Sequence, residues 1–283
     1  MFKTDMELKR EKTIDKVWKA INKHGGTTLL STGITGDDAR MAKAAVDAGT
    51  LMLEPNHPAV ALARGLDGVT TMNDAEAIRY KVPLEEMLKV TSGVRTVVGE
   101  DVYITVGVPG GFTEAMPINL KDEDYLAISQ AGADGLHVHK SGWEDLEEIV
   151  NKAHKYGLIV DTYIDQPSDT SDSIGISAET PEEVAKVAEK MEKIGVDMIG
   201  LMTGMTYQGG DAGEIHPDVK KRLNALINAV DVPTLAEGGI NLDNYKAFGD
   251  TGVNVLVVGT SFDDLAKDAV AGGVQKYISL KNK

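Results

Sequence analysis

The stretches Leu-Ala-Glu-Gly-Gly-Ile-Asn (residues 235–241) and Val-Leu-Val-Val-Gly-Thr-Ser (residues 255–261) decide the fold of this chain. Each is an apolar strand that runs into small residues and then opens a helix. Small residues let the backbone approach a ligand closely, and the start of a helix offers unpaired N–H groups. Two such ends on consecutive strands are typical of strands 7 and 8 of a (β/α)8 barrel, where they hold a phosphate. We therefore expect phosphate binding at Gly238, Gly239, Gly259 and Thr260, with the carboxylate of Glu237 beside them.

A repeated pattern of amphipathic helix, glycine and short apolar strand supports this fold. The glycines of the pattern are Gly49, Gly132, Gly157, Gly195 and Gly252. Each can end a helix in the left-handed conformation and turn the chain into a strand. Helices that alternate with buried strands predict right-handed βαβ units and a parallel sheet.

The pattern predicts eight strands, at residues 27–33, 50–54, 101–107, 134–139, 158–164, 197–202, 232–237 and 253–258. It predicts helices near 37–48, 74–92, 122–131, 141–156, 180–194, 216–229, 242–250 and 263–278. A further helix at 7–23 is placed to close the bottom of the barrel. We therefore expect an α/β fold, a single (β/α)8 TIM barrel domain over residues 1–283, with residues 1–26 as an N-terminal helical extension. A doubly wound sheet is the main competitor, but no G-x-G-x-x-G follows an early strand.

The composition limits the partners of the chain. The formal charge of −15 argues against nucleic acid or an anionic membrane as a partner, so an anionic substrate has to be held by local backbone dipoles. Cysteine is absent, which excludes disulfides and thiolate metal sites and fits a reducing cytoplasm. The charged N-terminus has no apolar segment of a signal peptide, and no stretch is long and apolar enough to span a membrane. We expect a cytoplasmic protein that forms a homo-oligomer.

The carboxyl ends of barrel strands face the active site, so their polar residues are the candidates for chemistry. We assign catalysis to Glu237, Lys140, Asp161 and His139, and substrate binding to His137, Asp165, Thr203 and Glu54. Burial would raise the pKa of Glu237 towards that of a general base, although a structural carboxylate remains the alternative. Lys140 is the only lysine at a predicted strand end; it can stabilise an oxyanion, form a Schiff base or simply point outward.

The two histidines alternate along one strand and therefore share a face. With Asp161 and Asp165 on the adjacent strand, a metal site of two histidines and two aspartates is sterically conceivable. The spacing matches no specific metal motif, so we expect no cofactor and keep a divalent metal as the less favoured alternative.

Residues 158–262 resemble the ribulose-phosphate-binding barrel superfamily, and are most similar to the N-acetylmannosamine-6-phosphate 2-epimerases. The segment Gly-Val-Asp-Met-Ile-Gly-Leu-Met-Thr-Gly-Met-Thr-Tyr (195–207) is similar to the strand-6 segment of that family, and 236–240 and 257–259 resemble its strand-7 and strand-8 signatures. The resemblance implies that the four phosphate-loop residues named above hold a sugar phosphate and that Glu237 is the catalytic glutamate.

One departure from that family affects the chemistry. The family carries a catalytic lysine on an early strand, in an Ile-Lys-Arg context, whereas residues 103–109 here read Tyr-Ile-Thr-Val-Gly-Val-Pro. Either Lys140 replaces that lysine or the chemistry differs. The sequence therefore predicts a sugar-phosphate isomerase or epimerase that acts through an enolate or enediolate. An aldolase or decarboxylase of a phosphorylated keto sugar acid, or a non-catalytic barrel that binds a sugar phosphate, are the alternatives.

Overall fold

The computed structural model describes residues 3–109, 120–165, 175–204 and 213–281, apart from the side chain of Asn73. Eight parallel strands form a closed barrel, which confirms the predicted (β/α)8 fold. In barrel order the strands are β1 (Thr28–Thr32), β2 (Met52–Glu54), β3 (Tyr103–Val106), β4 (Gly135–Val138), β5 (Ile159–Asp165), β7 (Met198–Met202), β8 (Thr234–Glu237) and β9 (Val255–Val258). A two-residue strand, β6 (Ile176–Ser177), pairs with the far end of β5. Strands 7 and 8 of the sequence prediction are therefore β8 and β9.

The N-terminal helix α1 (Asp5–Lys23) closes the bottom of the barrel, as predicted. Its buried residues Val17, Ala20 and Ile21 pack in one cluster with the inward-facing side chains of the strands. Arg10 and Lys16 fix the helix with ion pairs to Asp197 and Asp134, at 2.8 and 2.9 Å. The interior of the barrel is thus closed at the end opposite the carboxyl ends of the strands.

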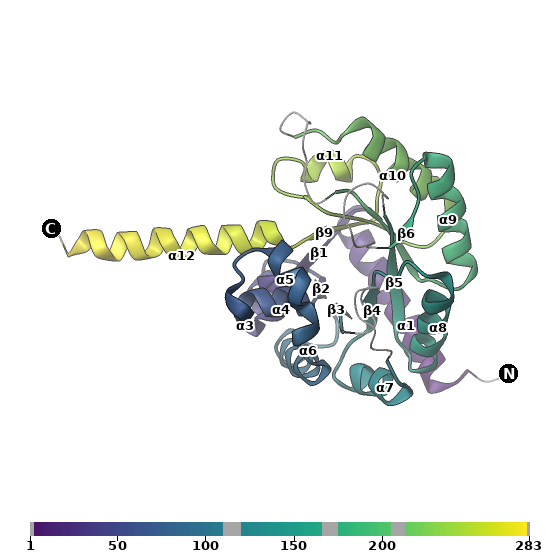
Figure 1. The fold of residues 1–283 in the computed structure, drawn as a ribbon, viewed down its shortest axis with the longest axis horizontal. Helices are drawn as coiled ribbons and strands as arrows, with labels where there is room; N and C mark the ends of the chain where they lie inside the picture. Colours follow the sequence, from purple (N-terminus) through teal and green to yellow (C-terminus); the bar gives the residue numbers. More distant parts are fainter. Residues whose placement is uncertain (1–2, 110–119, 166–174, 205–212, 282–283) are drawn as a thin grey trace.

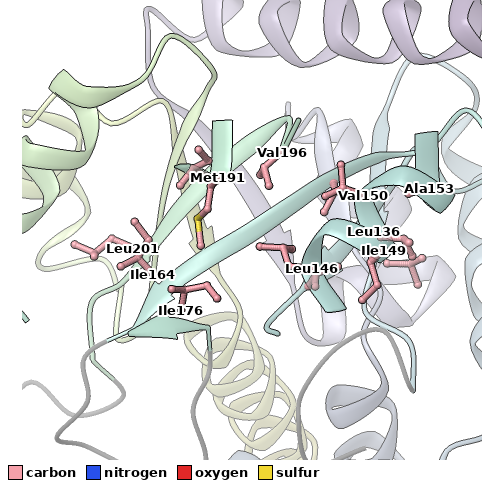
Figure 2. Packing of buried hydrophobic residues seen from close by; sticks show 14 of the residues in the cluster. Leu136, Leu146, Ile149, Val150, Ala153, Ile164, Ile176, Met191, Val196 and Leu201 are labelled. Atoms are coloured by element: carbon pink, nitrogen blue, oxygen red, sulfur yellow. The ribbon is translucent and has the colours of Figure 1, made fainter. Parts of the chain in front are cut away.

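Amphipathic helices cover the outside of the barrel (Figure 1). The longest of those that pack on it is α6 (Leu84–Val98), and the others include α3 (Ala39–Asp47), α7 (Asp122–Gln130), α8 (Trp143–Lys155), α9 (Pro181–Lys193), α10 (Pro217–Ala229) and α11 (Tyr245–Gly249). Their apolar faces form a continuous cluster with the outward-facing strand residues. Figure 2 shows part of this layer, with side chains from α8 and α9 beside strand residues such as Leu136, Ile164 and Leu201.

The region between β1 and β3 differs from the sequence prediction. The helix expected over 74–92 is divided into α5 (Met72–Ile78), a short 3-10 turn η2 (Arg79–Lys81) and α6. The break falls at Pro83, which stands at the N-cap of α6, because proline has no N–H to continue a helix. Three short elements were not predicted: α2 (Ile34–Asp37), α4 (His57–Ala63) and the 3-10 turn η1 (Leu66–Gly68).

The last helix, α12 (Thr260–Leu280), does not pack along the barrel as the other outer helices do. It projects from the barrel as one long helix that ends far from the body of the molecule (Figure 1). None of its residues is buried, and most of its apolar side chains are exposed to solvent. Among the described residues, no helix combines the length and apolar composition needed to cross a membrane.

Candidate active site

A cavity of about 560 Å³ lies at the carboxyl ends of the strands, between β1, β2, β8 and β9. All four predicted phosphate-binding residues line it, together with Glu237 and Glu54. Among its described lining residues, five are acidic and none is a lysine or arginine. An anion in this cavity would therefore depend on backbone N–H groups, as the net charge of the chain led us to expect. The described lining residues are Thr32, Gly33, Glu54, Asn56, Thr71, Met72, Glu76, Glu237, Gly238, Gly239, Ile240, Asn241, Val257, Gly259, Thr260, Ser261, Asp264, Leu265 and Asp268.

The loop after β8 needs its glycines for two physical reasons. Gly238 and Gly239 have φ of 110° and 67°, in the left-handed region. A Cβ on Gly238 would also lie 2.7 Å from the carbonyl oxygen of Gly204. The loop then folds into a turn in which the Asn244 amide donates to the Gly239 carbonyl at 3.0 Å. Because α11 begins only at Tyr245, this loop, and not a helix start, borders the cavity.

The loop after β9 matches the predicted anion-binding form more closely. Gly259 is the N-cap of α12 and brings no side-chain hydrogen bond to the helix start. The helix therefore begins directly at the cavity, with Thr260 and Ser261 in its first turn among the lining residues. The N–H groups of a first turn, with the positive end of the helix dipole, favour an anion at this position.

Below the cavity, His137 and Asp161 form a fully buried pair on neighbouring strands. The two residues lie opposite each other in the β4–β5 register, and His137 Nδ1 is 2.5 Å from Asp161 Oδ2. The other carboxylate oxygen of Asp161 accepts a hydrogen bond from the Thr105 hydroxyl at 2.6 Å. A carboxylate on Nδ1 fixes the ring orientation and directs Nε2 towards the other site residues.

Three groups surround His137 Nε2. The carboxylate oxygens of Glu54 and Glu237 lie 3.6 and 3.5 Å away, and His139 Nε2 lies 2.7 Å away. The predicted common face of the two histidines is therefore confirmed. Tyr163 stacks on His139 with ring centroids 4.6 Å apart and also approaches His137, at 4.9 Å. Five of the predicted site residues, from four strands, thus form one cluster of Glu54, His137, His139, Asp161 and Glu237, which we call the carboxylate–histidine cluster.

The electrostatic environment of the cluster raises the pKa values of His137, Glu54 and Glu237, and so favours their protonated forms. Burial alone would lower the pKa of His137, but the negative charges of Glu54, Asp161 and Glu237 outweigh it and raise that pKa to about 10. Burial raises the pKa of Glu54 to about 8, against the attraction of His137. Burial also raises the pKa of Glu237, again opposed by the positive charge of His137. A carboxyl group with a raised pKa is suited to give and take protons near neutral pH.

The cluster also contains a buried polar atom without a hydrogen bond. Among the described residues, Glu54 Oε2 has no hydrogen-bond partner, whereas the Tyr163 hydroxyl and the Glu237 carboxylate interact with each other. Native proteins leave few such atoms, and those that occur often mark a functional site. The Nε2 atoms of both histidines and a carboxylate oxygen of Glu237 lie within 4.8 Å of one another, which is a donor set that a divalent metal can use. The expectation of no cofactor stays a prediction.

The remaining predicted residues lie at the edge of this cluster. Lys140 directly follows His139 and is only 4% exposed, so it does not point into solvent. Thr203 donates its hydroxyl to the carbonyl oxygens of Glu237 and Gly238, at 2.8 and 2.7 Å, and so holds the end of β8. Asp165 ends β5, where its carbonyl accepts a hydrogen bond from Ala178. The catalytic role predicted for Lys140 and the substrate contacts predicted for Thr203 and Asp165 stay predictions. Residues 205–207 of the family resemblance lie outside the described part of the chain.

Sequence reasoning missed the residues that hold Glu54 in place. The Asn56 amide donates to Glu54 Oε1 at 3.1 Å and to the Thr32 hydroxyl at 2.8 Å. The Thr32 hydroxyl in turn donates to the Glu54 carbonyl at 2.9 Å. Asn56 also caps α4 by accepting from Ala59 N–H, and Asn-x-Pro before an apolar run was the signal that could have revealed this helix start. Glu76, on α5, is an acid at the cavity that sequence reasoning also missed.

The sequence is similar to enzymes of two kinds. No protein-family model matches the chain. A ribulose-phosphate 3-epimerase of Schizosaccharomyces pombe is 27% identical over 164 residues, which cover 56% of this chain and 63% of that protein. A thiamine-phosphate synthase of Herpetosiphon aurantiacus is 34% identical over 145 residues, or 50% of this chain and 58% of that protein. The chain thus matches about three fifths of the length of these curated relatives.

Solved structures share the fold at low sequence identity. A Burkholderia cenocepacia protein described as a phosphonomutase aligns with a TM-score of 0.61 and 16% identity, covering 93% of this chain and 99% of that one. A mutant tryptophan synthase α-subunit of Pyrococcus furiosus has a TM-score of 0.62, 12% identity and coverage of 86% and 91%. These likenesses establish the barrel fold alone. The two sequence relatives are enzymes by name, and the closed barrel is the feature that this chain shares with the solved structures.

Proposed function

We propose that this protein is a sugar-phosphate isomerase or epimerase that works through an enolate or enediolate. The observation that carries the proposal is the position of Glu237, which lines the cavity and also lies 3.5 Å from the buried His137. Its side chain is 22% exposed, so a ligand in the cavity can reach it. The glycine loops after β8 and β9 flank it and supply the backbone donors for a phosphate.

The chemistry follows from this placement. Glu237 takes the proton from the carbon next to the substrate carbonyl, and the electron pair of the C–H bond moves to the carbonyl oxygen. The positive charge of His137 lies beside the carboxylate and favours the developing oxyanion. Protonation of the enolate on the opposite face, by a second acid of the cluster, gives an epimer and leaves the abstracted proton on Glu237. Protonation at the neighbouring carbon gives an isomer. The similarity to a ribulose-phosphate 3-epimerase supports the first outcome.

Exchange with solvent deuterium tests the proposal. We would incubate the protein with a panel of ketose and aldose phosphates in D2O and follow loss of the α-proton signal by NMR. Glu237→Gln should abolish exchange while inorganic phosphate still binds. Glu147→Gln, on the exposed face of α8, is the matched control and should keep the wild-type rate. Binding of sugar phosphates without exchange anywhere in the panel would refute an enzyme of this type and support a binding barrel.

A lyase is the second candidate because of Lys140. Its side chain is 4% exposed at the end of β4, and a buried lysine amine can form a Schiff base with a keto substrate. Cleavage of a carbon–carbon bond would then give the enolate. Borohydride treatment in the presence of a phosphorylated keto sugar acid should fix a covalent adduct on Lys140 if this holds. Absence of an adduct together with deuterium exchange would exclude the Schiff-base route.

A further inference from the structure

The carboxylate–histidine cluster has the geometry of a metal site. In a tetrahedral site with metal–nitrogen and metal–oxygen distances of about 2.0–2.2 Å, neighbouring ligand atoms are about 3.3 Å apart. His137 Nε2 and Glu237 Oε2 are 3.5 Å apart, which fits this spacing. The two histidine Nε2 atoms are 2.7 Å apart, so the rings would separate by about 0.6 Å when an ion enters.

Charge and hydrogen bonding in the cluster agree with a cation. Three carboxylates, those of Glu54, Asp161 and Glu237, surround His137 in a region where both histidines are 1% exposed. Glu54 is also 1% exposed, and its Oε2 has no partner among the described residues. A buried acid oxygen that makes no hydrogen bond is costly, and a metal ion would displace the proton of this side chain and satisfy the oxygen directly or through a bound water.

Asp161 is hydrogen-bonded to the Nδ1 atom of His137, as carboxylates often are to metal-bound histidines. Asp161 accepts from Nδ1, which leaves Nε2 as the ligand atom, and Thr105 fixes the other oxygen of Asp161. Carboxylates in this position orient the imidazole and raise its basicity as a ligand. Two imidazoles with carboxylates suit Zn²⁺, Mn²⁺, Fe²⁺ or Co²⁺ better than Mg²⁺ or Ca²⁺, which prefer oxygen ligands alone.

We propose that this cluster binds one divalent transition-metal ion through His137 Nε2, His139 Nε2 and one oxygen of Glu237, with Glu54 adjacent and Asp161 as a positioning residue. The second oxygen of Glu237 remains for proton transfer. The ion would stand at the floor of the cavity, where it can polarise a carbonyl oxygen of a bound substrate. An ion at His137 Nε2 would displace the proton from that nitrogen, so in the metal-bound protein the ion, and not the imidazolium, would supply the positive charge beside the oxyanion. Metal binding can be measured without a substrate, so this proposal and the proposed reaction can fail separately.

Titration of metal-free protein with Co²⁺ tests the site without any substrate. We expect one Co²⁺ per chain, with the visible absorption of a nitrogen- and oxygen-ligated ion, and competition by Zn²⁺ in calorimetry. Asp161→Asn should weaken binding about 10- to 100-fold, and His139→Gln should weaken it at least as much. His216→Gln, which changes an exposed histidine at the start of α10, is the control and should bind like the wild type.

Two results would overturn the proposal. One is the absence of stoichiometric Co²⁺ or Zn²⁺ binding to correctly folded wild-type protein. The other is wild-type affinity in His139→Gln. If His139→Gln does not fold, Glu237→Gln provides the second ligand variant, because an amide of the same shape replaces a partly exposed carboxylate. Wild-type affinity in that variant would also count against the site.

A separate observation concerns α12. In a (β/α)8 barrel the helix after the last strand packs on the outside, where β9 meets β1. Here that helix turns away instead, and its exposed apolar residues form a stripe at helical spacing, which includes Val270, Val274, Tyr277 and Ile278. Tyr277 is 80% exposed and Val270 67%. Its first turn is fixed in this direction by the Asp263 carboxylate, which accepts from Ile34 N–H at 2.8 Å.

The surface that α12 would normally cover remains partly uncovered. Leu29 pairs with Leu256 across the β1–β9 register, and its side chain is only partly buried at the outer surface of the barrel. A helix of 21 residues is about 31 Å long and 10 Å wide, so its footprint is roughly 300 Å². Two helices exchanged between two copies would bury roughly 1,200 Å² in total, the lower end of the range for stable complexes.

We infer that α12 packs across β9 and β1 of a second copy of this chain, in a reciprocal exchange. Both the apolar stripe and the surface that it would cover are present in each copy, so the exchange closes as a two-fold dimer. The first turns of α12 line the cavity at Thr260, Ser261 and Leu265. The partner copy would therefore fix one wall of the site.

Disulfide trapping tests whether α12 of a second copy covers the surface over β9 and β1. The chain contains no cysteine, so only the introduced cysteines can form a bond. Leu29→Cys protein mixed with Val270→Cys, Val274→Cys or Ile278→Cys protein should give a covalent heterodimer in at least one pair. Sedimentation should show a dimer that Val274→Asp converts to monomer, whereas Gln275→Asp on the polar face leaves it unchanged. A monomer at micromolar concentration, a bond within one chain of the variant that carries both Leu29→Cys and Val274→Cys, or bonds only between two α12 helices would each overturn the inference.

Discussion

Replacement of Glu54 by glutamine should make the folded protein more stable, and increasingly so as the pH rises. Glu54 is 1% exposed, and burial raises its pKa from 4.5 to about 8. Between these two values the folded chain keeps a proton on Glu54 that the unfolded chain releases. The folded state then binds more protons, so its stability falls with increasing pH. Glutamine resembles the protonated acid in shape and has no proton to lose.

The magnitude follows from the size of the pKa shift. Each pKa unit corresponds to about 1.4 kcal/mol, so the wild type loses about 3 kcal/mol between pH 4.5 and pH 7 through this group, and about 4 kcal/mol by pH 8. The Glu54→Gln variant does not lose this stability, because glutamine does not titrate. At pH 7 Glu54 is still largely protonated, so its removal changes the charge around His137 little. The Asn56 amide can still donate to the side-chain oxygen at position 54.

Urea denaturation at pH 4.5, 6 and 7 in the presence of EDTA measures the effect. We expect the difference in unfolding free energy between variant and wild type to grow by about 3 kcal/mol over this range. Glu147→Gln, on the surface of α8, should stay within about 0.5 kcal/mol of the wild type at each pH. A difference that does not change with pH, or that shrinks as pH rises, would refute the buried, proton-retaining state of Glu54.

Two further predictions concern the cavity loop and the helix at the bottom of the barrel. Gly238→Ala should lower the free energy of unfolding by about 1–3 kcal/mol and weaken the binding of inorganic phosphate, because its Cβ would meet the Gly204 carbonyl. Denaturation and phosphate titrations measure the two effects. Gly252→Ala is the control for backbone strain, since Gly252 also has a positive φ but lies in open space. Arg10→Ala should lower the free energy of unfolding by about 1–3 kcal/mol, because it leaves the buried carboxylate of Asp197 with fewer partners. An unchanged denaturation midpoint would show that this contact does not hold α1 in place.

The barrel could be predicted because its signals are local. Each helix-ending glycine and each apolar strand can be recognised within about ten residues, and eight repeats leave few other folds. The strand ends then limited the candidate residues. His137 and Asp161 were both on that list, yet only the β4–β5 register shows that they face each other.

Other features depend on contacts that a linear pattern does not contain. The sequence predicted a helix over 263–278, and α12 forms there, but periodicity does not tell which surface a helix packs on. The link from Asn56 to Glu54 and Thr32 required the loop after β2 to fold back over the strand end. The division of 74–92 at Pro83 was visible in the sequence, because proline disfavours a continuous helix.

The helix at the bottom of the barrel has a consequence for the order of folding. During synthesis α1 is made first, but the acidic residues that it binds, Asp134 and Asp197, follow more than 100 residues later. Contacts of such separation in sequence cost more loop-closure entropy than local contacts, so we expect the bottom to close only after β7 has joined the sheet. Until then the apolar face of α1 needs another cover. A chain that lacks α1 should therefore resemble a late folding intermediate, and a separate peptide of α1 should bind to it and complete the barrel.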